Sequence, residues 1–214
     1  MLVPGNARRS AIWAMLALLL VLPSLVHAQS SVVWKTNYYT VGGTTLREIH
    51  ESFRHARPWK DGSSFDGLTE WRIDWRFQMA TADERCRCDS FTTQTAITIT
   101  LPRWTAPTNA APEVRDAWKS FFTALSKHEA GHAQNALAAV TEMHQRVTRL
   151  PTESDCAALK KKVDATAGGV VAEFRQRDVE FDRRTAHGAR DGAFLPRGRR
   201  GEFPRREPGV GLRR

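Results

Sequence analysis

Apolar and polar residues alternate strictly between positions 71 and 79. A period of two residues is typical of a strand with one buried and one wet face. Residues 91–101 are rich in Thr and Ile and predict a second strand, which we expect to pair with the first as an antiparallel hairpin. The β-branched and aromatic run at 32–41, ended by two glycines, predicts a further strand.

Helical spacing of apolar residues predicts three helices. Residues 45–55 begin with a capping-box pattern and predict a short amphipathic helix. From 113 to about 149 the apolar residues fall on one narrow face, and a second helical stretch runs from 154 to 181, weakened at Gly168-Gly169. These elements predict an α+β fold, in which a small antiparallel sheet packs against a long helix and a second, C-terminal helix.

The first 28 residues have the pattern of a secretory signal peptide. Arg8 and Arg9 precede an apolar run at 11–22, and small residues before and at Ala28 suit a cleavage site. The apolar run is shorter than the roughly 20 residues that a membrane-spanning helix needs. We therefore prefer a cleaved signal peptide over an uncleaved anchor, and expect a periplasmic or secreted protein.

The formal net charge of +9 suggests a nucleic-acid partner until its distribution is considered. Residues 1–28 hold two of the positive charges and residues 197–214 a net five, which leaves +2 for residues 29–196. We therefore expect no nucleic-acid partner and a single globular domain over 29–196. The tail at 197–214 is predicted to be basic and disordered; it serves solubility or makes weak contact with anionic envelope surfaces.

The segment HEAGH at 128–132 is an HExxH motif inside the long predicted helix. Residues at i and i+4 lie on one face, so both imidazoles can bind one metal ion. Zinc binds imidazole nitrogen in a tetrahedral shell that leaves places for a third protein ligand and a water molecule. We therefore predict Zn2+ bound by His128 and His132, with Glu129 as the general base of a peptidase that acts on a peptide or protein.

The third ligand does not follow from spacing. Ala138 stands where the metzincin pattern has a third histidine, so the ligand must come from the second helix or beyond. The candidates are Glu173, Asp178, Glu180, Asp182 and His187. For the substrate, the predicted strand at 91–101 lies nearest the motif in sequence, and we expect an extended peptide to pair with it.

The three cysteines allow two interpretations. In an oxidising compartment Cys156 is expected to form a disulfide with Cys86 or Cys88. Alternatively, Cys86, Cys88, His128 and His132 would form a closed structural zinc site. The protein would then be a non-catalytic envelope protein with a structural or vestigial metal site.

The order of motifs resembles a known family. A signal peptide is followed by a strand that leads from Cys86 to the LPRW segment ending at Trp104, then by HEAGH, Cys156 and FDRRTAHG at 181–188. This order resembles the predicted secreted zinc-dependent proteases of bacteria, also called domain of unknown function 922. The resemblance covers about residues 32–196 and favours a Cys86–Cys156 disulfide.

Membership in that family implies a zinc peptidase with His128 and His132 as ligands and Glu129 as the catalytic base. Its terminal motif implies that His187 is the third ligand. It also implies that Asp182 is either a ligand or a carboxylate that accepts the far N–H of a zinc-bound histidine.

Overall fold

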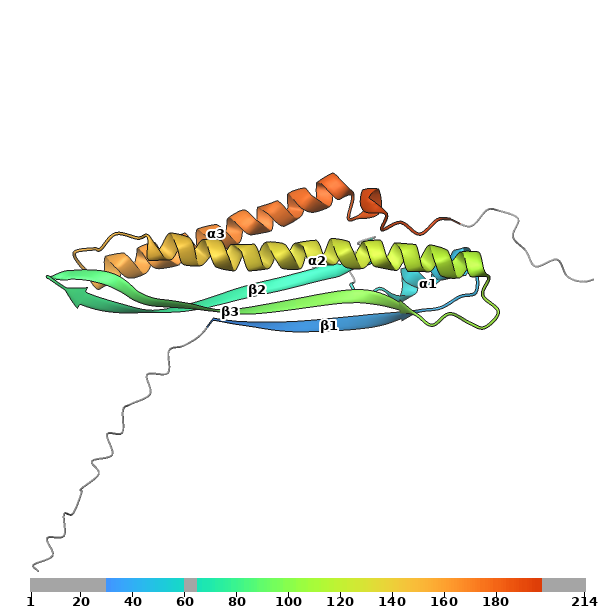
Figure 1. The fold of residues 1–214 in the computed structure, drawn as a ribbon, viewed down its shortest axis with the longest axis horizontal. Coiled ribbons are helices and arrows are strands. Elements are labelled where there is room, and N and C mark those ends of the chain that lie inside the picture. Colours follow the sequence, from blue (N-terminus) through green and yellow to red (C-terminus); the bar gives the residue numbers. More distant parts are fainter. Residues whose placement is uncertain (1–29, 60–64, 198–214) are drawn as a thin grey trace, which may run out of the picture.

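The computed structural model describes residues 30–59 and 65–197 (Figure 1). The predicted signal peptide and the tail beyond Arg197 lie outside these residues. The described chain forms β1 (Ser31–Val41), α1 (Leu46–Ala56), β2 (Leu68–Ala82), β3 (Arg85–Trp104), α2 (Pro112–Thr148), α3 (Cys156–Thr185) and the 3-10 turn η1 (Ala189–Asp191). None of these helices has the length and hydropathy of a membrane span.

The three strands form one sheet in the order β1-β3-β2. The predicted hairpin is confirmed: β2 is antiparallel to β3, and the chain turns at Asp83 and Glu84, both in the left-handed region. β1 pairs with the other side of β3 in the parallel direction, from Ser31 opposite Gln94 onward. Parallel neighbours need an intervening crossover, which α1 and β2 supply. The α+β class is as predicted, and the sheet is mixed.

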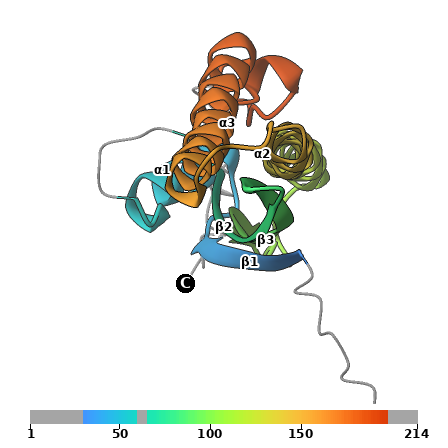
Figure 2. The ribbon, with the colours of Figure 1, turned by 90° about the vertical axis from the view of Figure 1, so that its left-hand side faces the viewer.

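α2 and α3 lie together on one face of the sheet (Figures 1 and 2). α3 runs unbroken through Gly168 and Gly169, where the sequence predicts a weak point. Its buried face, which includes Val163 and Val170, packs against the rest of the molecule. Tertiary packing of this kind outweighs the roughly 1 kcal/mol that each glycine costs in a helix.

Two apolar cores lie along α2. The core that includes the disulfide, here called the disulfide-end core, comprises Trp71, Ile73, Cys86, Phe91, Ile97, Ala133, Ala136, Ala139, Met143, Val147, Leu159, Val163, Ala167, Val170 and Phe174. The other, here called the aromatic core, comprises Tyr39, Val41, Ile49, Phe53, Leu101, Trp104, Ala110, Val114, Phe121, Leu125, Ala193 and Leu195. The HExxH segment of α2 lies between the two cores in sequence.

The disulfide joins Cys86, near the start of β3, to Cys156, the first residue of α3. This confirms the pairing that the family resemblance favours. Cys88 is a free, half-buried thiol. The bridge fastens the beginning of α3 to the sheet, at the opposite end of that helix from the FDRRTAHG motif.

Candidate metal centre

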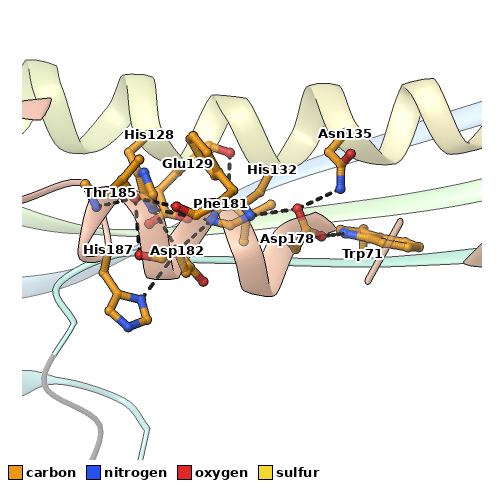
Figure 3. Close-up of polar contacts among 12 residues, drawn as sticks. Trp71, His128, Glu129, His132, Asn135, Asp178, Phe181, Asp182, Thr185 and His187 are labelled. Carbon is orange, nitrogen blue, oxygen red and sulfur yellow. Dashed lines mark hydrogen bonds and ion pairs between the residues drawn. The ribbon is translucent and has the colours of Figure 1, made fainter. Parts of the chain in front are cut away.

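Two pairs of polar residues face each other across the contact between α2 and α3 (Figure 3). His128 and His132 lie one turn apart on α2, while Asp178 and Asp182 lie one turn apart on α3. His128 meets Asp182 and His132 meets Asp178, so the two helices pass this point in opposite directions. A pair at i and i+4 on each helix therefore builds one compact site.

Three donor atoms converge in this site. Asp182 Oδ1 lies 3.0 Å from His128 Nε2 and 3.1 Å from His132 Nε2. The two Nε2 atoms are 3.3 Å apart. Among the described residues, His128, His132 and Asp182 form a group whose ligand atoms could all hold one metal ion.

Asp178 orients His132 from the side away from this cluster. Its Oδ1 lies 2.8 Å from His132 Nδ1 and accepts a hydrogen bond from Asn135 Nδ2 at 2.8 Å. Its Oδ2 accepts a bond from Trp71 Nε1 at 2.6 Å. With Nδ1 held by Asp178, Nε2 of His132 is directed at the cluster. A carboxylate in this role is typical of metal-binding histidines.

The ring of His128 is held by packing. It stacks on Phe181, with ring centroids 4.7 Å apart, while its buried Nδ1 has no hydrogen-bond partner among the described residues. Gly188 lies against the same ring, since a Cβ at that position would come within 2.8 Å of His128 Cγ. Phe181 and Gly188, both in the terminal motif, therefore fix this imidazole by shape.

Glu129 is buried beside the cluster. Thr69 Oγ1 donates a hydrogen bond to its Oε2 at 2.7 Å. Its Oε1 occupies the space that a side chain at Gly67 would take, because a Cβ there would come within 2.5 Å of that oxygen. Burial raises the pKa of Glu129 above its ordinary value. β2 and the segment before it thus hold the carboxylate in place.

The electrostatics of the cluster favour a positive charge. Burial alone would lower the pKa of His132, but Asp178 and Asp182 raise it to about 10. Burial opposes ionisation of Asp182, yet its contacts with His128 and His132 hold its pKa well below the usual range. A proton or a metal ion would satisfy this arrangement.

The terminal motif forms the turn that ends α3. Thr185 Oγ1 accepts a hydrogen bond from the Gly188 N–H at 3.1 Å, and Ala186 and His187 both adopt left-handed backbone conformations. The turn places His187 Nδ1 3.4 Å from Asp182 Oδ1. Its ring is not part of the three-residue donor group, and Figure 3 shows it below Asp182, away from the other two histidines. Asp182, and not His187, completes the three-residue donor group with His128 and His132.

A cavity of about 100 Å³ opens beside the cluster. One wall of the cavity is formed by Phe65 and Gly67, and Asp66 between them is held in place by two hydrogen bonds. Tyr39 Oη, in the aromatic core, donates to the Asp66 carbonyl at 2.6 Å, and Arg57 Nε donates to the Asp66 carboxylate at 3.0 Å. The cavity is lined by Phe65, Gly67, Leu68, Thr69, His128, Glu129, His132, Asp178, Asp182 and His187.

Two expectations are wrong. The four-residue zinc site with Cys86 and Cys88 is contradicted because Cys86 is in a disulfide. Cys86 also pairs with Thr81, which lies 12 residues, or roughly 40 Å of extended strand, from Thr69 beside Glu129. The predicted substrate strand at 91–101 lies in β3, the central strand, and its residues 94–100 are paired with β1 on one side and β2 on the other, so they cannot pair with a substrate strand.

Residues 36–188 match the family described as "Bacterial protein of unknown function (DUF922)". The chain belongs to this family. The matched stretch begins within β1 and ends at Gly188, so it contains every residue of the site described above. No curated protein and no solved structure matches the chain.

Sequence reasoning missed Asp178 as the partner of His132, and it missed Thr69 and Gly67 altogether. The first had a signal, because Asp178 and Asp182 repeat on α3 the i, i+4 spacing of the two histidines. Thr69 and Gly67 had none, since their roles depend on where β2 lies against α2.

Proposed function

We propose that this protein is a secreted zinc-dependent peptidase that hydrolyses peptide bonds in a peptide or protein substrate. The proposal rests on the convergence of His128 Nε2, His132 Nε2 and Asp182 Oδ1 beside the buried carboxylate of Glu129. In this proposal Asp182 is the third zinc ligand in place of His187.

The donor set suits zinc. With ligand distances of about 2.0–2.1 Å, a tetrahedral shell holds its ligand atoms about 3.3 Å apart. The three separations in the cluster are 3.0, 3.1 and 3.3 Å. Two imidazoles and one carboxylate also leave a fourth position for water. A bound zinc ion would polarise the scissile carbonyl and lower the pKa of that water.

Glu129 moves the proton in this mechanism. Thr69 holds Oε2, and the carboxylate lines the same cavity as the donor cluster. Glu129 takes a proton from the attacking water and returns it to the amine nitrogen as the C–N bond breaks. Because burial raises its pKa, the carboxyl group can retain the proton between these two steps.

The proposed location is the periplasm or the cell exterior. A disulfide persists in oxidising compartments and is rare in the cytosol. The Cys86–Cys156 bridge and the signal-peptide pattern at 1–28 both support this location.

The test compares wild type with Glu129→Gln, using metal content by mass spectrometry and hydrolysis of a peptide library. We expect one zinc ion per chain in both proteins and a rate about 10²- to 10⁴-fold lower in the variant, the usual contribution of a general base. Glu142→Gln, on the same helix but paired with Arg146, is the matched control and should keep full activity.

Hydrolysis that survives Glu129→Gln would contradict the mechanism, and a wild-type protein that binds no zinc would contradict the proposal as a whole. Zinc binding without hydrolysis in either protein would favour a binding protein with a vestigial site.

A further inference from the structure

His187 lies in the site without belonging to the donor cluster. Its side chain is 55% exposed, whereas those of His128 and His132 are 2% and 8% exposed. The ring lines the cavity that also contains Glu129. His187 is therefore the histidine of this site that a bound substrate meets most readily.

The backbone holds this ring in place at a cost. A left-handed conformation is unfavourable for a residue other than glycine, and Ala186 and His187 adopt it in succession, each with φ near 50°. The turn is held by the His187 N–H, which donates to the Asp182 carbonyl at 3.0 Å. The ring lies against Phe65 in a tilted arrangement, with centroids 5.6 Å apart. Strain that surrounding contacts maintain is concentrated at functional sites.

The protein does not use the hydrogen-bonding capacity of this imidazole fully. Nδ1 lies 3.4 Å from Asp182 Oδ1, beyond the usual 2.7–3.2 Å of an N–H···O hydrogen bond. Apart from that contact, neither ring nitrogen of His187 has a polar partner among residues 30–59 and 65–197. An imidazole carries at least one N–H in every protonation state, so the ring can donate a bond to a molecule in the cavity.

We propose that His187 is a catalytic residue that stabilises the oxyanion of the reaction. In peptide hydrolysis the oxygen of water bonds to the carbonyl carbon, and the electron pair of the C=O π bond moves onto the carbonyl oxygen. Glu129 takes the water proton and later delivers it to the leaving amine. The His187 N–H donates a hydrogen bond to the carbonyl oxygen while that oxygen carries negative charge. This hydrogen bond weakens when the C–N bond breaks and the C=O bond re-forms.

This inference rests on the proposed function, and it reassigns the residue that the resemblance makes a ligand. A bond that forms as charge develops acts on kcat and leaves substrate binding nearly unchanged. Removal of one such donor typically lowers kcat about 10²- to 10³-fold.

The experiment measures zinc content, kcat, KM and the affinity for a phosphinic peptide, whose tetrahedral phosphorus carries an anionic oxygen. His187→Ala removes the ring, and His187→Asn keeps an N–H donor on a residue that tolerates the left-handed region. His55→Ala, at an exposed position of α1, is the matched control.

We expect His187→Ala to keep one zinc ion, to lose about 10²- to 10³-fold in kcat and in phosphinic-peptide affinity, and to keep its KM. His187→Asn should recover part of both losses. If zinc is lost, His187 is a ligand and the inference is overturned. Unchanged phosphinic-peptide affinity overturns it as well.

The two proposals fail in different ways. Wild-type protein that binds zinc but hydrolyses no peptide contradicts the peptidase function, while the dependence of phosphinic-peptide affinity on His187 still decides the oxyanion role. Wild-type protein that binds neither zinc nor the phosphinic peptide overturns both.

Discussion

α2 contributes mostly small side chains to the disulfide-end core and larger ones to the aromatic core, and the two cores support different parts of the site. In the disulfide-end core, α2 contributes Ala133, Ala136 and Ala139. The aromatic core is built from large rings, such as Phe53 and Phe121 with centroids 5.8 Å apart. Small side chains let helices approach closely, whereas interlocking rings fill the space between elements of different kinds.

Each core therefore positions a different part of the site. The disulfide-end core sets the distance between α2 and α3, and with it the separation of the proposed zinc ligands. The aromatic core, through Tyr39 and Asp66, fixes the segment that leads to Gly67 and Thr69, and with it the position of Glu129. Changes at the first should alter metal affinity, and changes at the second should alter kcat with the metal still bound.

The largest effect is expected for Gly67→Ala. The new Cβ would overlap Glu129 Oε1 and displace the carboxylate, which can move without unfolding the protein. We expect kcat to fall about 10²- to 10⁴-fold, as for loss of the base, with one zinc ion still bound. Gly168→Ala is the control, since nothing lies near its Cβ, and it should raise stability by up to about 1 kcal/mol. Loss of zinc from Gly67→Ala would contradict the division in which the aromatic core positions Glu129 and the disulfide-end core positions the proposed zinc ligands.

Removal of the disulfide is expected to have the next largest effect. The bridge closes a loop of 70 residues, and the double variant Cys86→Ser/Cys156→Ser should lower the free energy of unfolding by about 4 kcal/mol. Denaturant titration measures this loss, and Cys88→Ser serves as the control because its thiol is free. Zinc affinity should fall with it, because α3 is then less firmly held. A weakened fold with unchanged zinc affinity would show that this core does not govern the metal site.

A smaller effect is expected for Asp178→Asn, which weakens the partner of His132 Nδ1. Zinc affinity, measured by chelator competition, should fall about 10- to 100-fold. The chain offers a close control, because Trp75 Nε1 donates to Asp164 on α3 much as Trp71 Nε1 donates to Asp178. Asp164→Asn weakens an equivalent strand-to-helix contact away from the site and should leave zinc affinity unchanged. Equal losses in both variants would mean that Asp178 only stabilises the fold.

The elements with a strong local signal could be predicted from sequence. The capping box is present, with the Glu48 N–H bonded to Thr45 Oγ1 at 3.3 Å, and the two predicted strands of the hairpin pair as expected. The parallel pairing of β1 with β3 could not be predicted, because strand order depends on contacts between distant segments. The weakness expected at Gly168-Gly169 is absent, since helix packing outweighs local propensity there.

The site shows the same limit. Spacing alone brought together His128, Glu129 and His132, because they lie on one helix. The choice between Asp182 and His187 depends on the shape of the turn after α3, where two left-handed residues carry the His187 ring past the cluster. The five-residue separation of Asp182 and His187 in the sequence does not reveal the shape of that turn.

α3 is fastened to the rest of the fold at both ends by bonds of different kinds. A covalent bridge holds its first residue, and about 39 Å along the axis the Asp182 carboxylate meets the imidazoles of α2. The helix is thus held covalently at Cys156 and by non-covalent polar contacts at Asp182. If zinc binds at this site as proposed, its removal by a chelator would weaken only the contact at Asp182 and leave the Cys86–Cys156 bridge intact, so we expect the end of the helix near Thr185 to loosen before the end at Cys156.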